Sequence, residues 1–225
     1  MWRDALLVAG KDLRIELRSR VVLNQVLPFA IVVLGLFAFA LGPDRAPMVQ
    51  GAAGLFWVAV LFAAVLSVQR SFALEATDGT RDGLRLSGLD PAGVFLGKVL
   101  AVAAQLLALE AVLTAGVVLF YGARMHSYAA AVAAAVAGTA GLAAVGTIYG
   151  ALAAGVRVRE TLLPFLLLPV AAPVLLAGTR AWQAALGTGP GGGDAADPWL
   201  RLLLVFAAVY LSLGVVIFGP LQEAG

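Results

Sequence analysis

Six long apolar segments occupy most of this 225-residue chain and limit it to one kind of fold. A helix needs roughly 20 apolar residues to cross a hydrocarbon layer about 30 Å thick, and the fifth segment is the shortest of the six. A backbone in lipid must satisfy its hydrogen bonds internally, and these segments lack the alternation typical of barrel strands. The sequence therefore predicts an all-α integral membrane protein with six transmembrane helices. The segments are 21–41, 49–68, 94–121, 128–154, 162–178 and 202–219.

Composition supports one membrane domain over residues 1–225, with the six spans in 21–219. Hydrophobic residues make up 62% of the chain and charged residues 12%, which is too few for the polar surface of a soluble domain. There is no cysteine, so disulfides, thiolate metal sites and cysteine nucleophiles are excluded. The net charge of +2 is divided among the loops and does not indicate a nucleic-acid partner.

Lysine and arginine are distributed unequally between the two sides of the predicted bundle. Because cytoplasmic loops are enriched in these residues, the richer side is predicted to be cytoplasmic, with both termini there. Three early acidic residues argue against a cleaved signal peptide. The richer side holds Arg3, Lys11, Arg14, Arg18, Arg20, Arg70, Arg81, Arg85, Lys98, Arg157 and Arg159, and the other holds Arg45, Arg124, Arg180 and Arg201.

Residues 1–20 have the periodicity of an amphipathic helix. Apolar residues recur at helical spacing on one face, and basic residues occupy the other, which predicts a helix lying along the cytoplasmic membrane surface. A simple anchor and a docking element for a partner both remain open. The apolar face is Leu6, Ala9, Leu13 and Leu17, and the basic face is Lys11, Arg14 and Arg18.

Residues 69–92 form the predicted cytoplasmic loop between the second and third spans. The loop mixes charged residues with apolar ones, which is typical of a short helix that docks in a groove on another protein, although a plain solvated connector is the alternative. The predicted anchors are Phe72 and Leu74, and the residues predicted to set orientation are Glu75, Asp78 and Arg81.

Several short motifs follow one another along most of the chain. They are Lys11–Arg20, the turn at 40–44, Trp57-Val-Ala, Arg70-x-Phe72, Glu75 with Asp78-Gly79, Leu86-Ser87, Lys98 and the proline-rich fifth span. Together and in this order they resemble the heme exporter protein B family, the membrane subunit of the ABC transporter of cytochrome c maturation.

The resemblance implies an ABC-2-like exporter permease of a bacterial inner membrane, present as two copies and driven by a separate ATPase subunit. That ATPase would meet the interface helix and the loop 69–92, and its cycle would serve loading or release of a periplasmic heme chaperone. Further implied partners are a heme-handling membrane subunit and a small single-span subunit. ATP and heme would be bound by other members of the complex. A noncatalytic scaffold of the same complex and a secondary transporter are the alternatives.

Two glycine motifs imitate nucleotide sites. The run Gly93–Val99 is one residue short of a phosphate-binding loop between its glycines and has Val99 where Ser or Thr would contact magnesium. Residues 187–192 match a dinucleotide pattern, but no strand precedes them, so we interpret 180–200 as a Gly-rich periplasmic loop. We therefore expect no enzymatic activity in this chain itself.

Two single residues are weaker candidates. His126 is the only histidine and lies in a predicted periplasmic turn, where heme iron would accept it, but one isolated ligand does not make a site. Glu110 is the only ionisable residue deep in a predicted span, so it should face a helix interface or a wet cavity, or be protonated. Its role is either translocation and coupling or a structural hydrogen bond to Gln105 or Thr114.

The fourth span is rich in glycine, which predicts close helix packing.

Overall fold

The computed structural model describes residues 1–19, 24, 27–28, 31–32, 35–36, 45–77, 88–153, 159–189 and 196–224. Throughout these ranges, all regular secondary structure is helical, as the sequence predicts. The long helices are α1 (Trp2–Ser19), α3 (Arg45–Thr77), α5 (Pro91–Tyr121), α6 (Tyr128–Ala153), α7 (Arg159–Ala185) and α8 (Asp197–Ala224).

Five of these helices, α3 and α5 to α8, are long and apolar enough to cross a membrane. They correspond to the second to sixth apolar segments, so those predictions are confirmed as helices of spanning length. The first segment, 21–41, lies mostly outside the described residues. A span there, which would bring the total to six, therefore stays a prediction. The candidate spans are Met48–Ala73, Pro91–Tyr121, Tyr128–Ala153, Leu162–Ala185 and Asp197–Leu221.

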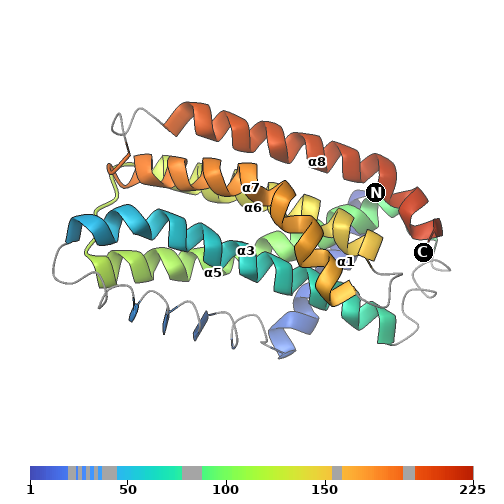
Figure 1. Ribbon diagram of the computed structural model, residues 1–225. Helices are drawn as coiled ribbons and strands as arrows, with labels where there is room; N and C mark the ends of the chain where they lie inside the picture. The colour runs from blue at the N-terminus through green and yellow to red at the C-terminus, as the bar shows by residue number, and fades with distance from the viewer. Residues whose placement is uncertain are drawn as a thin grey trace.

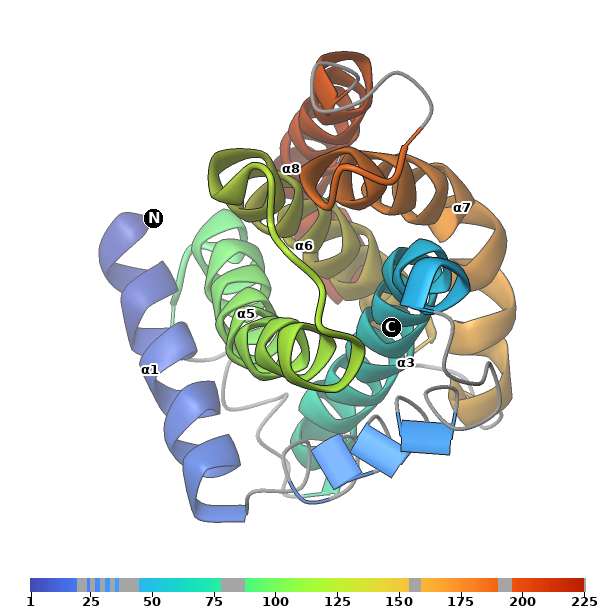
Figure 2. The ribbon, with the colours of Figure 1, turned by 90° about the vertical axis from the view of Figure 1, so that its left-hand side faces the viewer.

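The five helices lie side by side and run lengthwise through the bundle, whereas α1 crosses the bundle axis at a steep angle (Figures 1 and 2). The N- and C-terminal ends lie at the same end of the bundle (Figure 1). Helix α6 is central because it packs against α3, α5, α7 and α8. Helix α7 bends along its length (Figure 1), and it contains Pro164, Pro169 and Pro173, which remove backbone hydrogen bonds.

Glycines in α6 and α7 let neighbouring side chains approach the helix backbone, as the sequence predicts for the fourth span. The indole ring of Trp57 lies against both Gly138 and Gly178, where any side chain would collide with it. A Cβ at Gly150 would lie 2.5 Å from the Phe72 ring, and one at Gly146 would lie 2.8 Å from Val68. Small residues thus bring α3, α6 and α7 together through direct packing, which drives helix association in lipid.

Two predicted loops are shorter than the sequence suggested. Helix α3 continues to Thr77, so residues 69–77 extend a span instead of starting a loop, and α5 begins at Pro91. Asp90 caps α5, because its Oδ1 accepts a hydrogen bond of 3.1 Å from the amide of Ala92. The Gly-rich loop predicted at 180–200 is also shorter than expected, because α7 runs to Ala185 and α8 begins at Asp197.

Candidate functional site

A cluster of charged and polar side chains joins α1 to the end of α3 and the start of α5. We call it the α1 junction and define it by Asp12, Glu16, Arg70, Ser71 and Lys98. Lys98 Nζ lies 3.7 Å from Asp12 Oδ2 and donates a hydrogen bond of 3.1 Å to Ser71 Oγ. Ser71 Oγ donates to Asp12 Oδ2 at 3.4 Å, and Arg70 Nε lies 3.2 Å from Glu16 Oε2. Three helices far apart in sequence therefore meet in one polar network.

Lys98 is the most buried member of the α1 junction. Only 1% of its surface is exposed, and its Nζ lies 4.6 Å from the centre of the Phe72 ring, in cation–π geometry. A buried ammonium without a counter-charge is strongly unfavourable, whereas a paired one is tolerated. Asp12 on α1 thus supplies a charge that the α5 side chain needs.

Beside the α1 junction, the backbone of α1 packs directly on two glycines of α5. A Cβ at Gly97 would lie 2.6 Å from Val8 Cβ and 2.7 Å from the Ala5 carbonyl oxygen, and one at Gly93 would lie 2.7 Å from the Met1 carbonyl oxygen. The spacing Gly93-x-x-x-Gly97 is therefore a helix-packing motif. Helix packing thus explains the two glycines of the run Gly93–Val99, which imitates a phosphate-binding loop.

The sequence predicts an apolar face and a basic face for α1. In the structure α1 has a face buried against the protein, a set of exposed leucines and a set of exposed arginines. Ala9 was predicted on the apolar face with Leu6 and Leu17, but Ala9 is buried against the protein while Leu6 and Leu17 are 67% and 68% exposed. The buried side of α1 is the one that packs on the α5 glycines, through the Ala5 carbonyl and the Val8 side chain. Arg14 and Arg18 are exposed. Lys11 Nζ lies 2.9 Å from Asp12 Oδ1 at the edge of the α1 junction.

A second ionic contact lies at the start of α1. The Met1 amine lies 3.2 Å from Asp4 Oδ2 and 3.4 Å from Asp90 Oδ2, and the Asp90 amide donates to Asp4 Oδ2 at 3.4 Å. The hydrogen bond between the amine and Asp4 raises the pKa of the amine and lowers the pKa of the carboxyl. Both ends of the contact between α1 and α5 thus carry paired charges.

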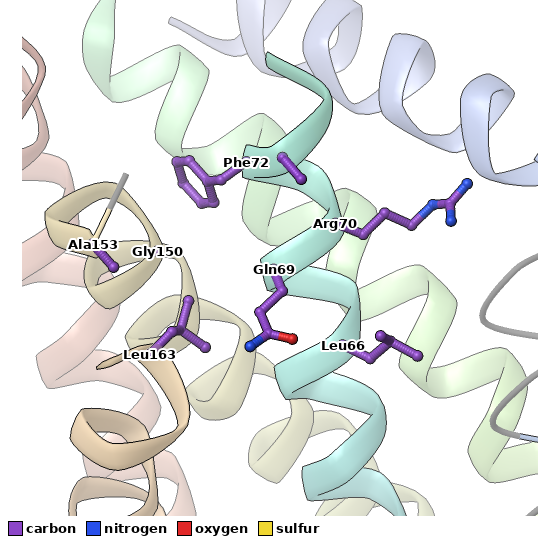
Figure 3. Close-up of a pocket in the computed structure, with 8 residues that line it drawn as sticks. Leu66, Gln69, Arg70, Phe72, Gly150, Ala153 and Leu163 are labelled. Carbon is purple, nitrogen blue, oxygen red and sulfur yellow. The ribbon is translucent and has the colours of Figure 1, made fainter. Parts of the chain in front are cut away.

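Of the five residues predicted to dock a partner, only Phe72 has a described side chain. It is 8% exposed, and its ring points from α3 towards Gly150 and Ala153 of α6, whereas Arg70 points the opposite way, towards α1 (Figure 3). The prediction of Phe72 as an external anchor is therefore corrected, because its ring fills space between helices of the same chain. A pocket of about 330 Å³ lies beside it. Leu74 and Glu75 lie on the last turns of α3, and Asp78 and Arg81 lie outside the described residues.

Glu110 is buried between α5 and α6. Its Oε1 accepts a hydrogen bond from Thr139 of α6, and within the described part of the chain its Oε2 has no partner. The predicted partners Gln105 and Thr114 do not bind the carboxylate, since Thr114 Oγ1 donates instead to the Glu110 backbone carbonyl at 2.7 Å. The expectation that Glu110 faces a helix interface is confirmed, and its partner comes from another helix.

We predict that Thr139→Val destabilises the protein by about 1–3 kcal/mol, because the buried carboxyl loses its hydroxyl donor. Thermal unfolding in detergent would measure the change. Thr114→Val is the matched control, since its hydroxyl bonds to a carbonyl already inside a helix, and it should have the smaller effect. Equal effects of the two variants would contradict the structural importance of the contact between Glu110 and Thr139.

His126 lies at the other end of α5 from the α1 junction. Its backbone amide donates to the Ala185 carbonyl at 2.8 Å, and its ring lies beside Gly187, whose φ of 70° and lack of Cβ leave room for it. Among the described residues, no group of three or more His, Cys, Asp or Glu side chains is placed to hold a metal. The local contacts of His126 thus join the α5–α6 turn to the end of α7.

Sequence reasoning missed the α1 junction, although it had noted Lys98 and the residues around Asp12 separately. Two signals were available: the Gly93-x-x-x-Gly97 spacing directly before a lysine, and an aspartate on the small-residue face of the first helix. Neither signal alone pairs α1 with α5.

The long apolar helices and their glycine-mediated packing define this chain as an all-α integral membrane protein with several spans. Comparison with known proteins identifies the family of this membrane protein. The chain belongs to the CcmB protein family, which matches residues 3–220.

Individual relatives agree with the family assignment. The chain is 31% identical to heme exporter protein B of Paracoccus denitrificans over 221 residues, which cover 95% of this chain and 94% of the relative. It is 31% identical to heme exporter protein B of Pseudomonas aeruginosa over 204 residues, with 89% of each chain covered. With the protein of the same name from Rhodobacter capsulatus it shares 33% identity over 181 residues, covering 76% of this chain and 78% of the relative.

Proposed function

We propose that this chain is the membrane permease subunit of an ABC transporter for heme export or heme delivery in c-type cytochrome biogenesis. Support comes from its membership of the CcmB family and from relatives named heme exporter protein B that match nearly its whole length. ATP hydrolysis belongs to a separate ATPase subunit, and the cycle serves loading or release of a periplasmic heme chaperone. The chain itself holds neither ATP nor heme.

The observation that carries the coupling part of this proposal is the α1 junction. An ATPase on the cytoplasmic side can act on the spans only through elements that are fixed to them. The α1 junction fixes α1 to α3 and α5 through buried and partly buried ion pairs, next to the segment that joins these two spans. A noncatalytic scaffold would need no such connection between its surface helix and two spans.

The proposed complex contains two copies of this chain, a heme-handling membrane subunit and a small single-span subunit. We propose six spans in the bacterial inner membrane, with both termini in the cytoplasm and α1 along the membrane surface. The steep crossing of α1 supports this orientation, as do its exposed leucines and arginines (Figures 1 and 2). Helix α1 and the start of α3 also lie at opposite ends of the bundle (Figure 1).

The topology predicts that cysteines introduced at Trp2 and Ser127 react from opposite sides of the membrane with an impermeant thiol reagent. The chain has no cysteine of its own, so labelling has no background. Intact cells or spheroplasts should label only Ser127→Cys, and inverted vesicles only Trp2→Cys. Labelling of both positions from one side would refute the six-span arrangement.

The proposed docking role of the last turn of α3 and the segment that follows it is tested by Glu75→Lys/Asp78→Lys. We expect loss of ATPase capture and about a tenfold or greater fall in cytochrome c yield at equal membrane levels, since charge reversal at an interface opposes association. Arg124→Glu, an exposed charge reversal at the other end of α5, is the control and should leave capture unchanged. Wild-type capture and yield in the double variant would favour the scaffold.

A further inference from the structure

Lys98 contacts residues of both α1 and α3 from its position on α5. The side chain belongs to α5, its ion-pair partner Asp12 to α1, and its hydrogen-bond and ring partners Ser71 and Phe72 to α3. All of these contacts converge on one ammonium group that is 1% exposed. A displacement of α1 away from the bundle would remove its aspartate and leave the charge buried.

Helix α1 packs closely on α5 on the side of the α1 junction where the chain begins. There, Gly93 and Gly97 contact the α1 backbone and the Val8 side chain. On the other side, a cavity of about 420 Å³ lies between α1 and α5, lined by Leu13 and Leu17 on α1 and by Ala108 on α5. The pairs of Asp12 with Lys98 and of Glu16 with Arg70 are thus the polar links next to that cavity.

We propose that the pair of Asp12 and Lys98 makes α1, α3 and the first turns of α5 move as one rigid unit. A force applied to α1 from the cytoplasm would then reach both spans together, so Lys98 is a positioning residue for coupling. This inference rests on the proposed function, because it requires a partner that moves α1 during a cycle of ATP hydrolysis.

The direct test measures distances between spin labels in the complete complex with the ATPase subunit. Leu7→Cys on α1 and Leu100→Cys on α5 place labels at two exposed positions outside the α1 junction, in a chain with no other cysteine. With only one of the two copies labelled and the other cysteine-free, we expect one narrow distance distribution that is the same without nucleotide and with ATP and vanadate. Adding Asp12→Asn or Lys98→Met should broaden the distribution and lower cytochrome yield per ATP hydrolysed by about tenfold, as loss of coupling between sites does.

Asp12→Asn keeps the size of the side chain and lies on α1 outside the spans, so it tests the inference even if Lys98→Met does not insert stably. Arg3→Gln, which removes an exposed α1 charge outside the α1 junction, should leave both distance and yield unchanged. A distance that changes with nucleotide in the parent pair would overturn the inference, as would an unchanged distribution and yield in Asp12→Asn. Failure of the parent chain to assemble with any ATPase would instead reject the proposed function.

Discussion

Gly138→Leu should destabilise the membrane bundle by roughly 3 kcal/mol or more, at the upper end of the range for overpacked cores. The position has no space for a side chain, because the Trp57 ring occupies it, and the same ring also lies against Gly178. Trp57 is itself fully buried and its ring packs edge-on against Phe56, so moving the ring would disturb the core around it. Thermal unfolding of the protein in detergent would measure the loss.

Gly54→Leu is the matched control for this prediction. It makes the same substitution inside a span, but a Cβ there meets no atom of the described residues within 4 Å. Its unfolding temperature should stay close to that of the parent protein. Similar losses at Gly138 and Gly54 would mean that leucine is costly in these helices for a reason other than contact with Trp57.

Gly97→Leu should detach α1 from α5 and prevent stable capture of the ATPase subunit. The leucine would occupy the space of Val8 and of the Ala5 carbonyl, and movement of α1 would also separate Asp12 from Lys98. Overpacking of 1–3 kcal/mol combined with a broken buried ion pair of about 3–5 kcal/mol exceeds what one short surface helix can offset. Limited proteolysis within α1 should become much faster while the spans remain intact.

Gly10→Leu provides the comparison, because within the part of the chain that the structure describes a Cβ at Gly10 of α1 meets no atom within 4 Å. Proteolysis and ATPase capture should then match those of the parent chain. If Gly97→Leu also behaved like the parent chain, α1 would not be held to α5 by the contacts described above.

The helices of this fold follow from the sequence because lipid leaves the backbone few alternatives. A segment of spanning length must satisfy its hydrogen bonds internally, so hydropathy alone locates α3 and α5 to α8. Their ends are less predictable, because a helix continues past the lipid where polar residues still favour it. Helix α7 extends through Arg180 and Gln183, whose side chains hydrogen-bond at 3.3 Å on its last turns.

The candidate site was harder to predict because its contacts join residues distant in the chain. Ser71 and Asp12 are separated by 59 residues and Thr139 and Glu110 by 29, and periodicity carries no information about such pairs. The position of Phe72 also could not be predicted from the sequence alone. An aromatic residue near the end of a span is consistent with either an external anchor or a core position, and Gly150 on α6 decides for the core.

The most direct test of the proposed function is purification of this chain under mild conditions from membranes of cells that are making c-type cytochromes. The proposal predicts that an ABC ATPase subunit copurifies in a fixed ratio and that its ATP hydrolysis responds to the periplasmic heme chaperone. Recovery of the heme-handling subunit without any ATPase, or hydrolysis that is indifferent to the chaperone, would contradict a permease and indicate a scaffold.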